Sequence, residues 1–452
     1  MLKKSVFIFR RDLRLQDNSG LIAAMEASES VIPVFIIDPA LLARWSSAVA
    51  RLAFLTASLQ KLDEELKTYN SRLTVLHGDP VEVVAGLIEK SGVDAVFINR
   101  DYTPIALRRD AKLAELCAGH EINFYKYGDQ LLNEPESVAK ADGLPYTVFT
   151  PFFRKARDLQ VSAPVAFSYS NFAKADSSKD LHSSPLASYI DPTRESRDGG
   201  AASLLAQLEI LDNYDESKDI PGVTGTTRLS AYLRFGLVSA RQVYQAVLDA
   251  HSLAHGVIKQ LYWRDFYFHI GYHFPHVYRS AFRKKYRNLA WDDNPSGFQK
   301  WQNGKTGFPI VDAGMRELMS TGFMHNRVRM ITASFLTKNL HINWQLGEAH
   351  FARYLIDYDP ALNNGNWQWS ASTGCDAQPY FRVFNPWRQQ KRFDPECRYI
   401  KQWIPELGSL EPKEIHGLEK IEDAYLPQIV DLKFSAEESK ARFKALASQQ
   451  PI

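Results

Sequence analysis

Residues 4–10, KSVFIFR, combine an unbroken apolar run with β-branched and aromatic side chains, which is typical of a strand buried on both faces. Amphipathic stretches such as residues 51–70 and 79–92 follow it and alternate with further apolar runs. Strands that alternate with helices predict a parallel sheet covered on both sides. We therefore predict an α/β domain over residues 1–128, with a doubly wound, five-stranded parallel sheet. The other four predicted strands are residues 31–37, 72–78, 95–100 and 122–127.

The first predicted strand continues into RRDLRLQDN, residues 10–18, which contains no glycine. A dinucleotide fingerprint needs glycines so that the backbone can approach a pyrophosphate closely. The sequence therefore disfavours a standard NAD-binding unit. Ligands of open parallel sheets bind at the carboxyl ends of the strands, so this domain can still hold another ligand there.

The pattern changes after the first domain. Residues 129–202 lose the periodicity, and the stretch at 176–200 is rich in Ser, Asp, Gly and Pro, which predicts a long connector. Helical periodicity then dominates residues 203–452, where strand signals are nearly absent. We predict an all-helical domain there, and we find no internal repeat.

Composition excludes several classes of protein. The 452 residues are 45% hydrophobic, enough for large cores, and no run of about eighteen apolar residues predicts a membrane span. Cys117, Cys375 and Cys397 are odd in number and widely spaced, which argues against a disulfide framework. We expect a monomeric protein of the cytoplasm.

The net charge of +2 does not by itself indicate a nucleic-acid-binding protein. Residues 259–287, however, contain seven Lys or Arg against one Asp, interleaved with aromatic residues, as expected where a protein faces phosphates and stacks on bases. A solvated helix face is the alternative. Eight of the nine tryptophans lie in the helical half, which is more than packing requires: Trp263, Trp291, Trp301, Trp344, Trp367, Trp369, Trp387 and Trp403.

GTTRLSAYLRFG, residues 225–236, places hydroxyl groups and an arginine at the start of a predicted helix. Such a helix start suits a phosphate, although an ordinary N-cap is the commoner meaning of a Thr-Thr pair. Two histidine pairs at i,i+4 spacing, His251 with His255 and His269 with His273, can form half a zinc site. No HExxH motif and no suitable cysteine accompanies them, so we predict no metal site.

Two further segments carry unusual polar residues. In MHNRVRM, residues 324–330, Asn326 and Met330 share one face of a predicted helix, while Arg329 points elsewhere and needs an acidic partner if it is buried. DYDPALNNGNWQWSASTG, residues 357–374, interleaves acids, amides and indoles in a way that a packed core does not require. Taken alone, the first segment is a polar helix with a surface arginine, and the nearest plausible acid for Arg329 lies in the second segment.

Taken in order, these segments resemble the photolyase and cryptochrome family, and most closely the class I photolyases that repair cyclobutane pyrimidine dimers. The resemblance covers nearly the whole chain, and its two longest blocks are unusual in composition. It rests on residues 7–18, 226–236, 261–266, 305–336 and 359–386.

The resemblance implies an enzyme, a deoxyribodipyrimidine photolyase, with FAD in its helical domain. Blue light drives an electron from the reduced flavin into a pyrimidine dimer flipped out of DNA, and the cyclobutane ring splits. Arg329 would pair with Asp357 beside the flavin ring, and Asn363 would face flavin N5, where an amide can donate or accept a hydrogen bond. The further FAD-binding residues would be Tyr214, Thr226, Thr227, Arg228, Leu229, Ser230, Tyr358 and Asp359.

The resemblance also assigns roles to the indoles. Trp367, Trp344 and Trp291 match the chain of tryptophans that carries an electron from the surface to the photo-oxidised flavin, although each alone would suit a core. Trp263 and Trp369 match the walls of the dimer pocket, where an extruded base pair needs aromatic surfaces in place of its lost stacking. The residues expected to contact the lesion or its strand are Gln260, Asn326, Arg327, Met330 and Gln389.

Two features depart from the family pattern. Gln260 stands where the cyclobutane class has a glutamate and the six-four photolyases have a glutamine, while Asn326 and Met330 replace two histidines that six-four repair needs. Cyclobutane repair is favoured, with six-four repair and a cryptochrome-type photosensor as alternatives. Thr103 and Pro104 occupy the loop that carries a glutamate in folate-binding members, so the expected antenna pigment is a deazaflavin or a second flavin.

Overall fold

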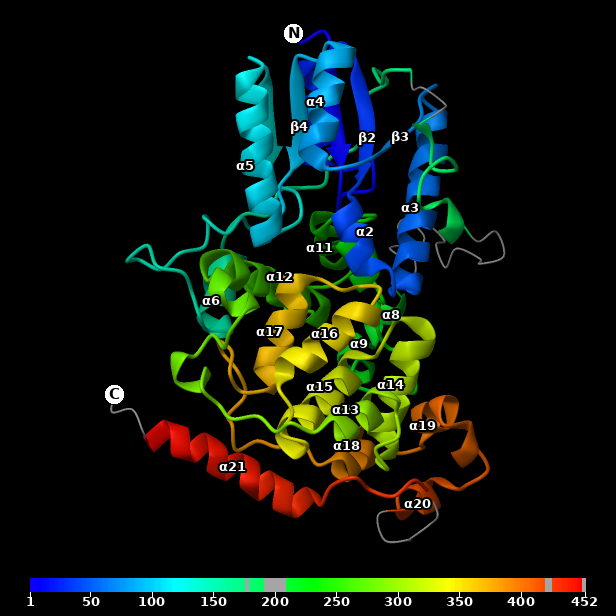
Figure 1. Ribbon diagram of the computed structural model, residues 1–452, viewed down its shortest axis with the longest axis vertical. Coiled ribbons are helices and arrows are strands. Elements are labelled where there is room, and N and C mark those ends of the chain that lie inside the picture. Colours follow the sequence, from blue (N-terminus) through cyan, green and yellow to red (C-terminus); the bar gives the residue numbers. More distant parts are fainter. Residues whose placement is uncertain (175–178, 191–208, 419–424, 449–452) are drawn as a thin grey trace. The chain divides into compact units, whose positions relative to one another are not determined.

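The computed structural model describes residues 1–174, 179–190, 209–418 and 425–448 (Figure 1). Parts of the predicted connector, at residues 175–178 and 191–202, lie outside the described residues. The chain divides into two compact units. Unit 1 comprises Met1–Leu144, Phe153–Leu208 and Arg228–Tyr272, and unit 2 comprises Pro145–Phe152, Glu209–Thr227 and His273–Ile452.

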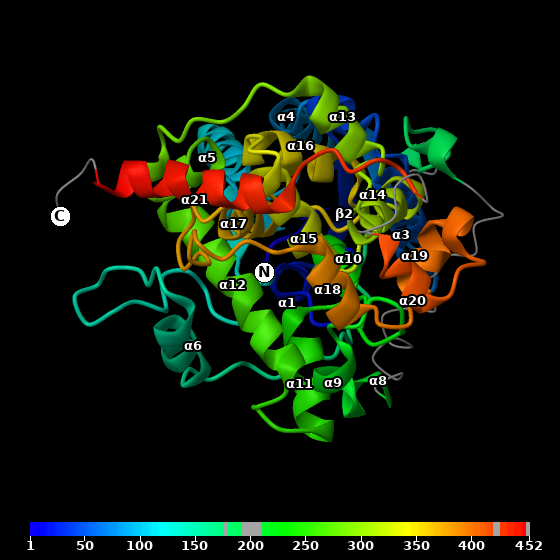
Figure 2. The ribbon, with the colours of Figure 1, turned by 90° about the horizontal axis from the view of Figure 1, so that it is seen from below.

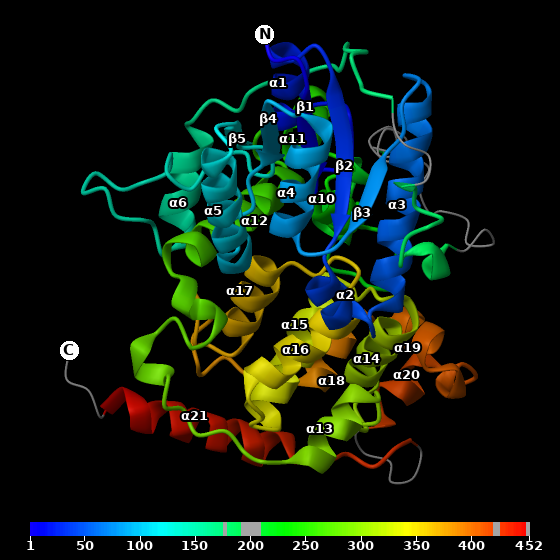
Figure 3. The same cartoon turned by 45° about the horizontal axis from the view of Figure 1, so that its top comes forward.

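Unit 1 contains a parallel sheet of five strands in the order β3-β2-β1-β4-β5 (Figure 3). The chain runs outward from β1 to β3 and then returns to the other side of β1 for β4 and β5. This doubly wound order confirms the predicted α/β fold. The strands are β1 (Ser5–Phe9), β2 (Val31–Ile37), β3 (Thr74–His77), β4 (Ala95–Asn99) and β5 (Asn123–Tyr127).

Both faces of β1 are buried. Val6 packs in one cluster with side chains of α4 (Pro80–Ser91) and α5 (Pro104–Gly119). Phe7 points to the opposite face, where α1 (Ser19–Ala27) contacts β1, β4 and β5. Because successive side chains of a strand serve opposite faces, a strand covered on both sides reads as a continuous apolar run.

Three helices of residues 228–272 belong to unit 1: α10 (Ser230–Phe235), α11 (Ala240–Ala250) and α12 (Gly256–His273). Gly236 ends α10 with a φ of 69°, and a Cβ at this position would overlap the backbone of Arg11. Arg241 of α11 forms ion pairs with Asp17, at 3.1 Å, and with Asp129, at 3.0 Å. These close approaches group α10 and α11 with the α/β part of the chain.

Unit 2 consists of helices and loops, with no strand among its described residues (Figure 2). Across all the described residues, no helix is long and apolar enough to cross a bilayer. The elements used below are α9 (Tyr214–Ser217), 3₁₀ helix η4 (Lys284–Tyr286), α13 (Pro295–Gln302), α14 (Pro309–Thr321), α15 (Asn326–Ser334), π-helix η5 (Phe335–Asn339), α16 (Trp344–Tyr354), α17 (Pro360–Ser370), α18 (Pro386–Phe393) and α21 (Leu432–Ser448).

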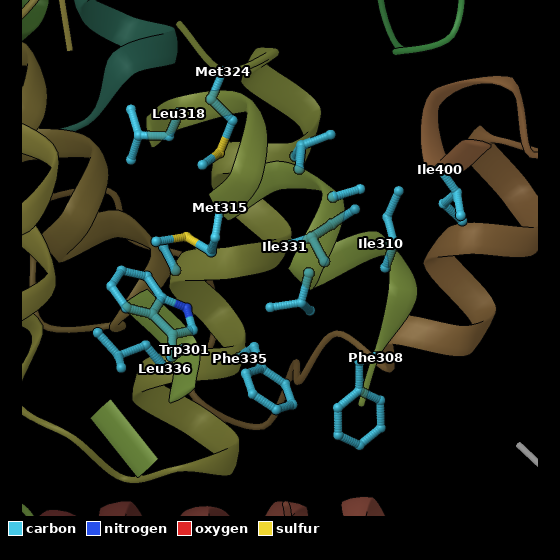
Figure 4. Close-up of a cluster of buried hydrophobic side chains, with 14 of the residues drawn as sticks. Trp301, Phe308, Ile310, Met315, Leu318, Met324, Ile331, Phe335, Leu336 and Ile400 are labelled. Atoms are coloured by element: carbon cyan, nitrogen blue, oxygen red, sulfur yellow. The ribbon is translucent and has the colours of Figure 1, made fainter. Parts of the chain in front are cut away.

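The core of unit 2 surrounds Trp301 of α13, which is fully buried (Figure 4). Its ring lies parallel to the rings of Phe298 and Phe351, with centroids 5.8 and 6.1 Å away. The indole Nε1 donates a hydrogen bond of 3.1 Å to the carbonyl of Thr332. Trp301 is therefore a fixed support for the side chains that pack against it, which include Trp367.

Candidate functional site

An ion pair between α15 and the segment before α17 forms one side of the candidate site. Arg329 donates from Nη2 to Oδ2 of Asp357 at 2.9 Å and from Nε to the carbonyl of Met324 at 2.8 Å. The Asp357 side chain is only 6% exposed, and its Oδ1 is buried without a hydrogen-bond partner among the described residues. A buried carboxylate oxygen in this condition is a position for a donor on a ligand.

Asp359 has a different task from Asp357. Its carboxylate accepts hydrogen bonds from the backbone N–H groups of Ala361, at 2.9 Å, and Leu362, at 3.2 Å, and Pro360 occupies the first helical position. Asp359 thus caps α17 and fixes where this helix begins. The cap sets the position of every side chain that α17 presents, including Asn363 one turn later.

Asn363 is held by a glutamate that the sequence analysis did not single out. Its Nδ2 donates to the side-chain Oε1 and to the carbonyl of Glu348, both at 3.0 Å. Burial raises the pKa of Glu348 to about 7. Because the amide nitrogen is engaged by Glu348, the amide oxygen is the end that can accept a hydrogen bond from a ligand N–H. The sequence contained one clue to Glu348: it lies one helical turn after Trp344, so the two side chains share a face of the helix.

The three tryptophans predicted to carry electrons meet in one hydrophobic cluster. Trp344 and Trp367 are buried members of it, and the partly buried Trp291 packs against it. Trp367 lies 4.9 Å from the ring of Phe351 and 6.1 Å from that of Trp301, both in edge-on geometry. The Nε1 of Trp367 has no partner among the described residues. Trp344 and Trp367 are therefore densely packed and shielded from water, and Trp291 lies at the edge of the cluster.

The predicted lesion contacts on α15 lie within its first two turns. Asn326 is exposed, and its Nδ2 lies 3.9 Å from Sδ of Met330 on the same helical face. Arg327 donates to Asp219 at 2.8 Å, and its guanidinium stacks over the ring of Phe393, 4.3 Å from the centroid. Unit 2 also contains the partly exposed side chains of Trp369 on α17 and Gln389 on α18.

Gln260 and Trp263 lie on α12 in unit 1. Gln260 is exposed, and Trp263, one turn further, is partly exposed against Phe266 and Tyr267, each 5.7 Å away between ring centroids. The i,i+3 spacing puts Gln260 and Trp263 on one face of the helix. Both side chains are at least partly exposed, whereas most of the remaining residues of α12 are buried.

The predicted phosphate segment divides between the two units. Thr226 and Thr227 belong to unit 2, as does Tyr214 of α9, whose pKa burial raises to about 12. Arg228 is the first residue of the third segment of unit 1 and has a left-handed φ of 50°, and Ser230 is the first residue of α10. The residue before it, Leu229, provides no side-chain cap, so the ordinary N-cap interpretation does not hold here.

The two predicted histidine pairs lie in different surroundings. The rings of His251 and His255 stack with centroids 4.7 Å apart, and Nε2 of His269 lies 3.0 Å from the carbonyl of Asn133. Within the described part of the chain, no group of three His, Cys, Asp or Glu side chains is arranged to hold a metal ion. The absence of a metal site stays a prediction.

The loop after β4 is ordered by its own polar residues. Thr103 caps α5 by accepting from the N–H of Ala106, and Asp101 accepts from the N–H of Thr103 at 3.0 Å. Burial by itself would raise the pKa of the Asp101 carboxyl. Positive charge outweighs burial and holds this pKa well below its usual range, and part of that charge is the guanidinium of Arg11, which lies 3.5 Å from Asp101. A charged, capped loop thus stands at the carboxyl end of the sheet.

The chain combines an α/β unit with a helical unit, and the helical unit contains a tryptophan cluster and a buried carboxylate with one oxygen that can bind a ligand. These features define the class of protein. Residues 5–167 match the family described as DNA photolyase, and residues 257–445 match the FAD binding domain of DNA photolyase. The chain is 38% identical over 434 residues to the deoxyribodipyrimidine photo-lyase of a Synechococcus species, which covers 91% of this chain and 89% of that protein.

Solved structures agree with this match. The archaeal photolyase of Sulfolobus tokodaii, determined with two FAD molecules, superposes with a TM-score of 0.88 at 39% identity, over 98% of this chain and all of that one. A cryptochrome of Synechocystis superposes with a TM-score of 0.85 at 26% identity, over 98% of this chain and 99% of that one. The chain belongs to the photolyase/cryptochrome family, as the sequence predicted.

Proposed function

We propose that the protein is a deoxyribodipyrimidine photolyase, which uses blue light to split cyclobutane pyrimidine dimers in DNA. The curated relatives that bear this name match along about nine-tenths of the chain. Asn363 is the residue that favours DNA repair over a photosensor function, because cryptochromes typically have another residue at the position that faces the flavin. Here the amide is fixed by Glu348, so its orientation is set before a ligand binds.

The residues of unit 2 fit FAD. When bound in its reduced form and excited by light, FAD supplies the electron that opens the dimer. Asp357 would accept a hydrogen bond from the flavin ring at its unpartnered Oδ1, while Arg329 compensates the negative charge of the carboxylate. Asn363 would offer its amide oxygen. A second carboxylate in place of Asn363 would instead repel an anionic ring.

The remaining FAD and DNA contacts are proposed from the family motif. The phosphates and ribityl chain would be bound by Tyr214, Thr226, Thr227, Arg228, Leu229 and Ser230, with Tyr358 and Asp359 also near the cofactor. Trp263 and Trp369 would stack on the extruded bases. Damaged DNA would be contacted by Gln260, Asn326, Arg327, Met330 and Gln389.

The tryptophan cluster would recharge the cofactor. Trp367 would first give an electron to the oxidised cofactor, Trp344 would then reduce the oxidised Trp367, and Trp291 would reduce Trp344, so that the oxidised indole is finally Trp291. Their shared hydrophobic cluster supports this role, because it holds the rings at fixed separations and keeps water from the two inner members. We expect the transfer to be independent of DNA.

A second light-absorbing cofactor is proposed for unit 1, at the carboxyl end of the sheet. A deazaflavin or a second flavin is favoured over folate, because Thr103 caps α5 in the loop where folate-binding members carry a glutamate. The two FAD molecules of the Sulfolobus tokodaii photolyase support a flavin. We further propose a cytoplasmic monomer; the three cysteines are all free, which suits a reducing compartment.

The test is repair by the purified, fully reduced protein under blue light, with one oligonucleotide that contains a thymine dimer and a second that contains a six-four photoproduct. We expect loss of the cyclobutane dimer only in the light and no change in the six-four lesion. An unchanged dimer would overturn the proposal, and repair of the six-four lesion alone would move it to the other class. Gln260→Glu is the matched variant, because it restores the residue of the cyclobutane class.

A further inference from the structure

One basic segment of unit 2 has no part in the proposed FAD and lesion contacts. Residues 279–287, RSAFRKKYR, contain five Lys or Arg and no acid. Like charges this close together repel one another, so the segment favours an anionic partner. Its five cations form no ion pair with any of the residues that the structure describes: Arg279, Arg283, Lys284, Lys285 and Arg287.

The segment is not the solvated face of an α-helix. Between 3₁₀ helix η3 (Pro275–Tyr278) and α13, the described chain forms only the short 3₁₀ helix η4. Its apolar residues turn inward, where Ala281, Tyr286 and Leu289 form a buried cluster with Phe443 of α21. Each cation of the segment stays at least partly exposed. Packing of the apolar residues therefore leaves the positive charge on the solvent side.

Hydrogen bonds fasten the backbone of this segment to the carboxyl end of α17. Gln368, which is 2% exposed, accepts a hydrogen bond from the N–H of Phe282 at 2.8 Å. The N–H of Arg283 donates to the carbonyl of Thr373 at 3.0 Å. Trp369, a proposed wall of the dimer pocket, directly follows Gln368 in the chain. The cations are thus attached to the helix that would hold the extruded bases.

Helix α21 adds two more cations beside η4. The helix runs along the outside of unit 2, and its buried Phe443 meets Tyr286 with ring centroids 5.1 Å apart (Figure 2). Lys440 and Lys444 are exposed, and their i,i+4 spacing puts them on one face of the helix, about 5–6 Å apart. We call residues 279–287, together with Lys440 and Lys444, the basic surface.

The acids of α21 do not neutralise the basic surface. Glu438 and Asp292 are both bound by Arg442, at 2.6 and 2.7 Å. At 100° per residue, Arg442 points away from the face that carries Lys440. Glu437 is the exposed acid near that face, which leaves an excess of positive charge.

The composition of the basic surface suits phosphates better than a bilayer. A helix that binds an anionic bilayer needs exposed apolar side chains beside its cations. Here Phe443 and the partly buried Leu446 pack against the cluster around Tyr286. The exposed Phe434 lies at the first turn of α21, away from Lys444 in its last turns. The surface therefore offers charge without an apolar face.

We propose that the basic surface binds the phosphate backbone of the duplex beside the lesion, without preference for sequence or damage. The inference deepens the proposed function, which supplies the DNA. A duplex carries one negative charge about every 1.7 Å along its axis, so cations on a fixed backbone can meet several phosphates. Such contacts position a protein on DNA, whereas the pocket of Trp369 would select the dimer.

The experiment measures binding of the holoprotein in the dark to an undamaged duplex, and to the same duplex with one thymine dimer, at several salt concentrations. Lys284→Gln combined with Lys285→Gln should weaken binding of both duplexes by about 10-fold, so that the preference for the dimer is retained. The slope of log affinity against log salt should fall by about 2. Lys440→Gln combined with Lys444→Gln should act in the same direction.

The matched control is Lys401→Gln combined with Lys413→Gln. It removes the same charge from α19 (Arg398–Trp403) and α20 (Pro412–Ile415), which lie away from the carboxyl end of α21 in Figures 1, 2 and 3. Binding by this control should match that of the native protein. An equal loss in the control would show an effect of net charge alone and would overturn the proposal.

Three other results would overturn it: unchanged affinity in the Lys284 and Lys285 variant, loss of affinity for the damaged duplex alone, or loss of binding to anionic vesicles without loss of binding to DNA. The flavin spectrum of each variant shows whether its fold is kept. If the dimer is not repaired in light but both duplexes bind as expected, the basic surface stands and the proposed function fails.

Discussion

Replacing Gly347 by alanine tests how tightly the innermost tryptophan is held. Gly347 lies inside α16, and a Cβ added there would stand 2.5 Å from Cζ3 of Trp367 and 2.5 Å from Cδ2 of Leu336, and closer still to Cη2 of the indole. Carbon atoms in contact are normally about 3.5–4.0 Å apart. The indole would therefore have to retreat by about 1 Å. Phe351 and Trp301 pack edge-on against the same indole, which limits its movement.

Two opposing effects determine the size of the change. Alanine favours a helix over glycine by about 1 kcal/mol, which on its own would stabilise the variant. Overpacking a rigid core costs about 1–3 kcal/mol, and the upper part of that range applies because both obstructing side chains are buried in the same cluster. We expect Gly347→Ala to lower the free energy of unfolding by about 2 kcal/mol.

The assay is urea unfolding followed by tryptophan fluorescence, with Gly86→Ala as the matched control. Gly86 lies inside α4, and a Cβ there meets no atom within 4 Å, so this substitution should stabilise unit 1 by about 1 kcal/mol. Gly347→Ala should also retain less FAD and photoreduce more slowly, since the displaced ring is the one next to the proposed cofactor. If both substitutions stabilise the protein equally, the packing of Trp367 is not tight and the reasoning fails.

Three further perturbations test individual contacts. Arg329→Leu leaves the buried carboxylate of Asp357 without its ion pair. We expect the unfolding free energy to fall by about 3 kcal/mol, at the lower end for a buried pair because the Arg329 side chain is 24% exposed, and we expect FAD to be lost. Unchanged stability would contradict the pairing. Glu348→Gln addresses pH. The folded pKa of Glu348, about 7, exceeds its ordinary value of 4.5, so its contribution to stability is present below 4.5 and is lost as the pH rises through 7. The variant should lose less stability than the native protein across that window in urea titrations, and parallel curves would show that Glu348 is not buried as described. Trp367→Phe should slow photoreduction but spare repair by chemically reduced protein, and undiminished photoreduction would remove Trp367 from the electron path.

Several parts of the molecule could be predicted from local sequence alone. Alternation of apolar runs with amphipathic stretches predicted the parallel sheet, and the structure confirms five parallel strands. This works because a strand covered on both faces has a distinct composition, whatever its neighbours are. The resemblance to photolyases was likewise carried by contiguous blocks of residues, and the comparisons confirm the family.

Spacing along one helix also carried information. Asn326 and Met330 were expected on one face of a helix, and they lie on one face of α15. The same rule could have drawn attention to Glu348, four residues after Trp344. It did not, because a glutamate on an amphipathic helix is ordinary until its partner is known. That partner, Asn363, lies in a segment that begins only after α16 has ended, so spacing within α16 cannot reveal the contact.

The tertiary structure alone decided which distant groups meet. Arg327 pairs with Asp219 across 108 residues, and His341 faces Ser435 across 94. The burial that raises the pKa of Glu348, and the close contact that excludes a side chain at Gly347, likewise exist only once helices pack. Periodicity encodes which face of an element is apolar, but the partner of that face is set by the packing of segments far apart in the chain.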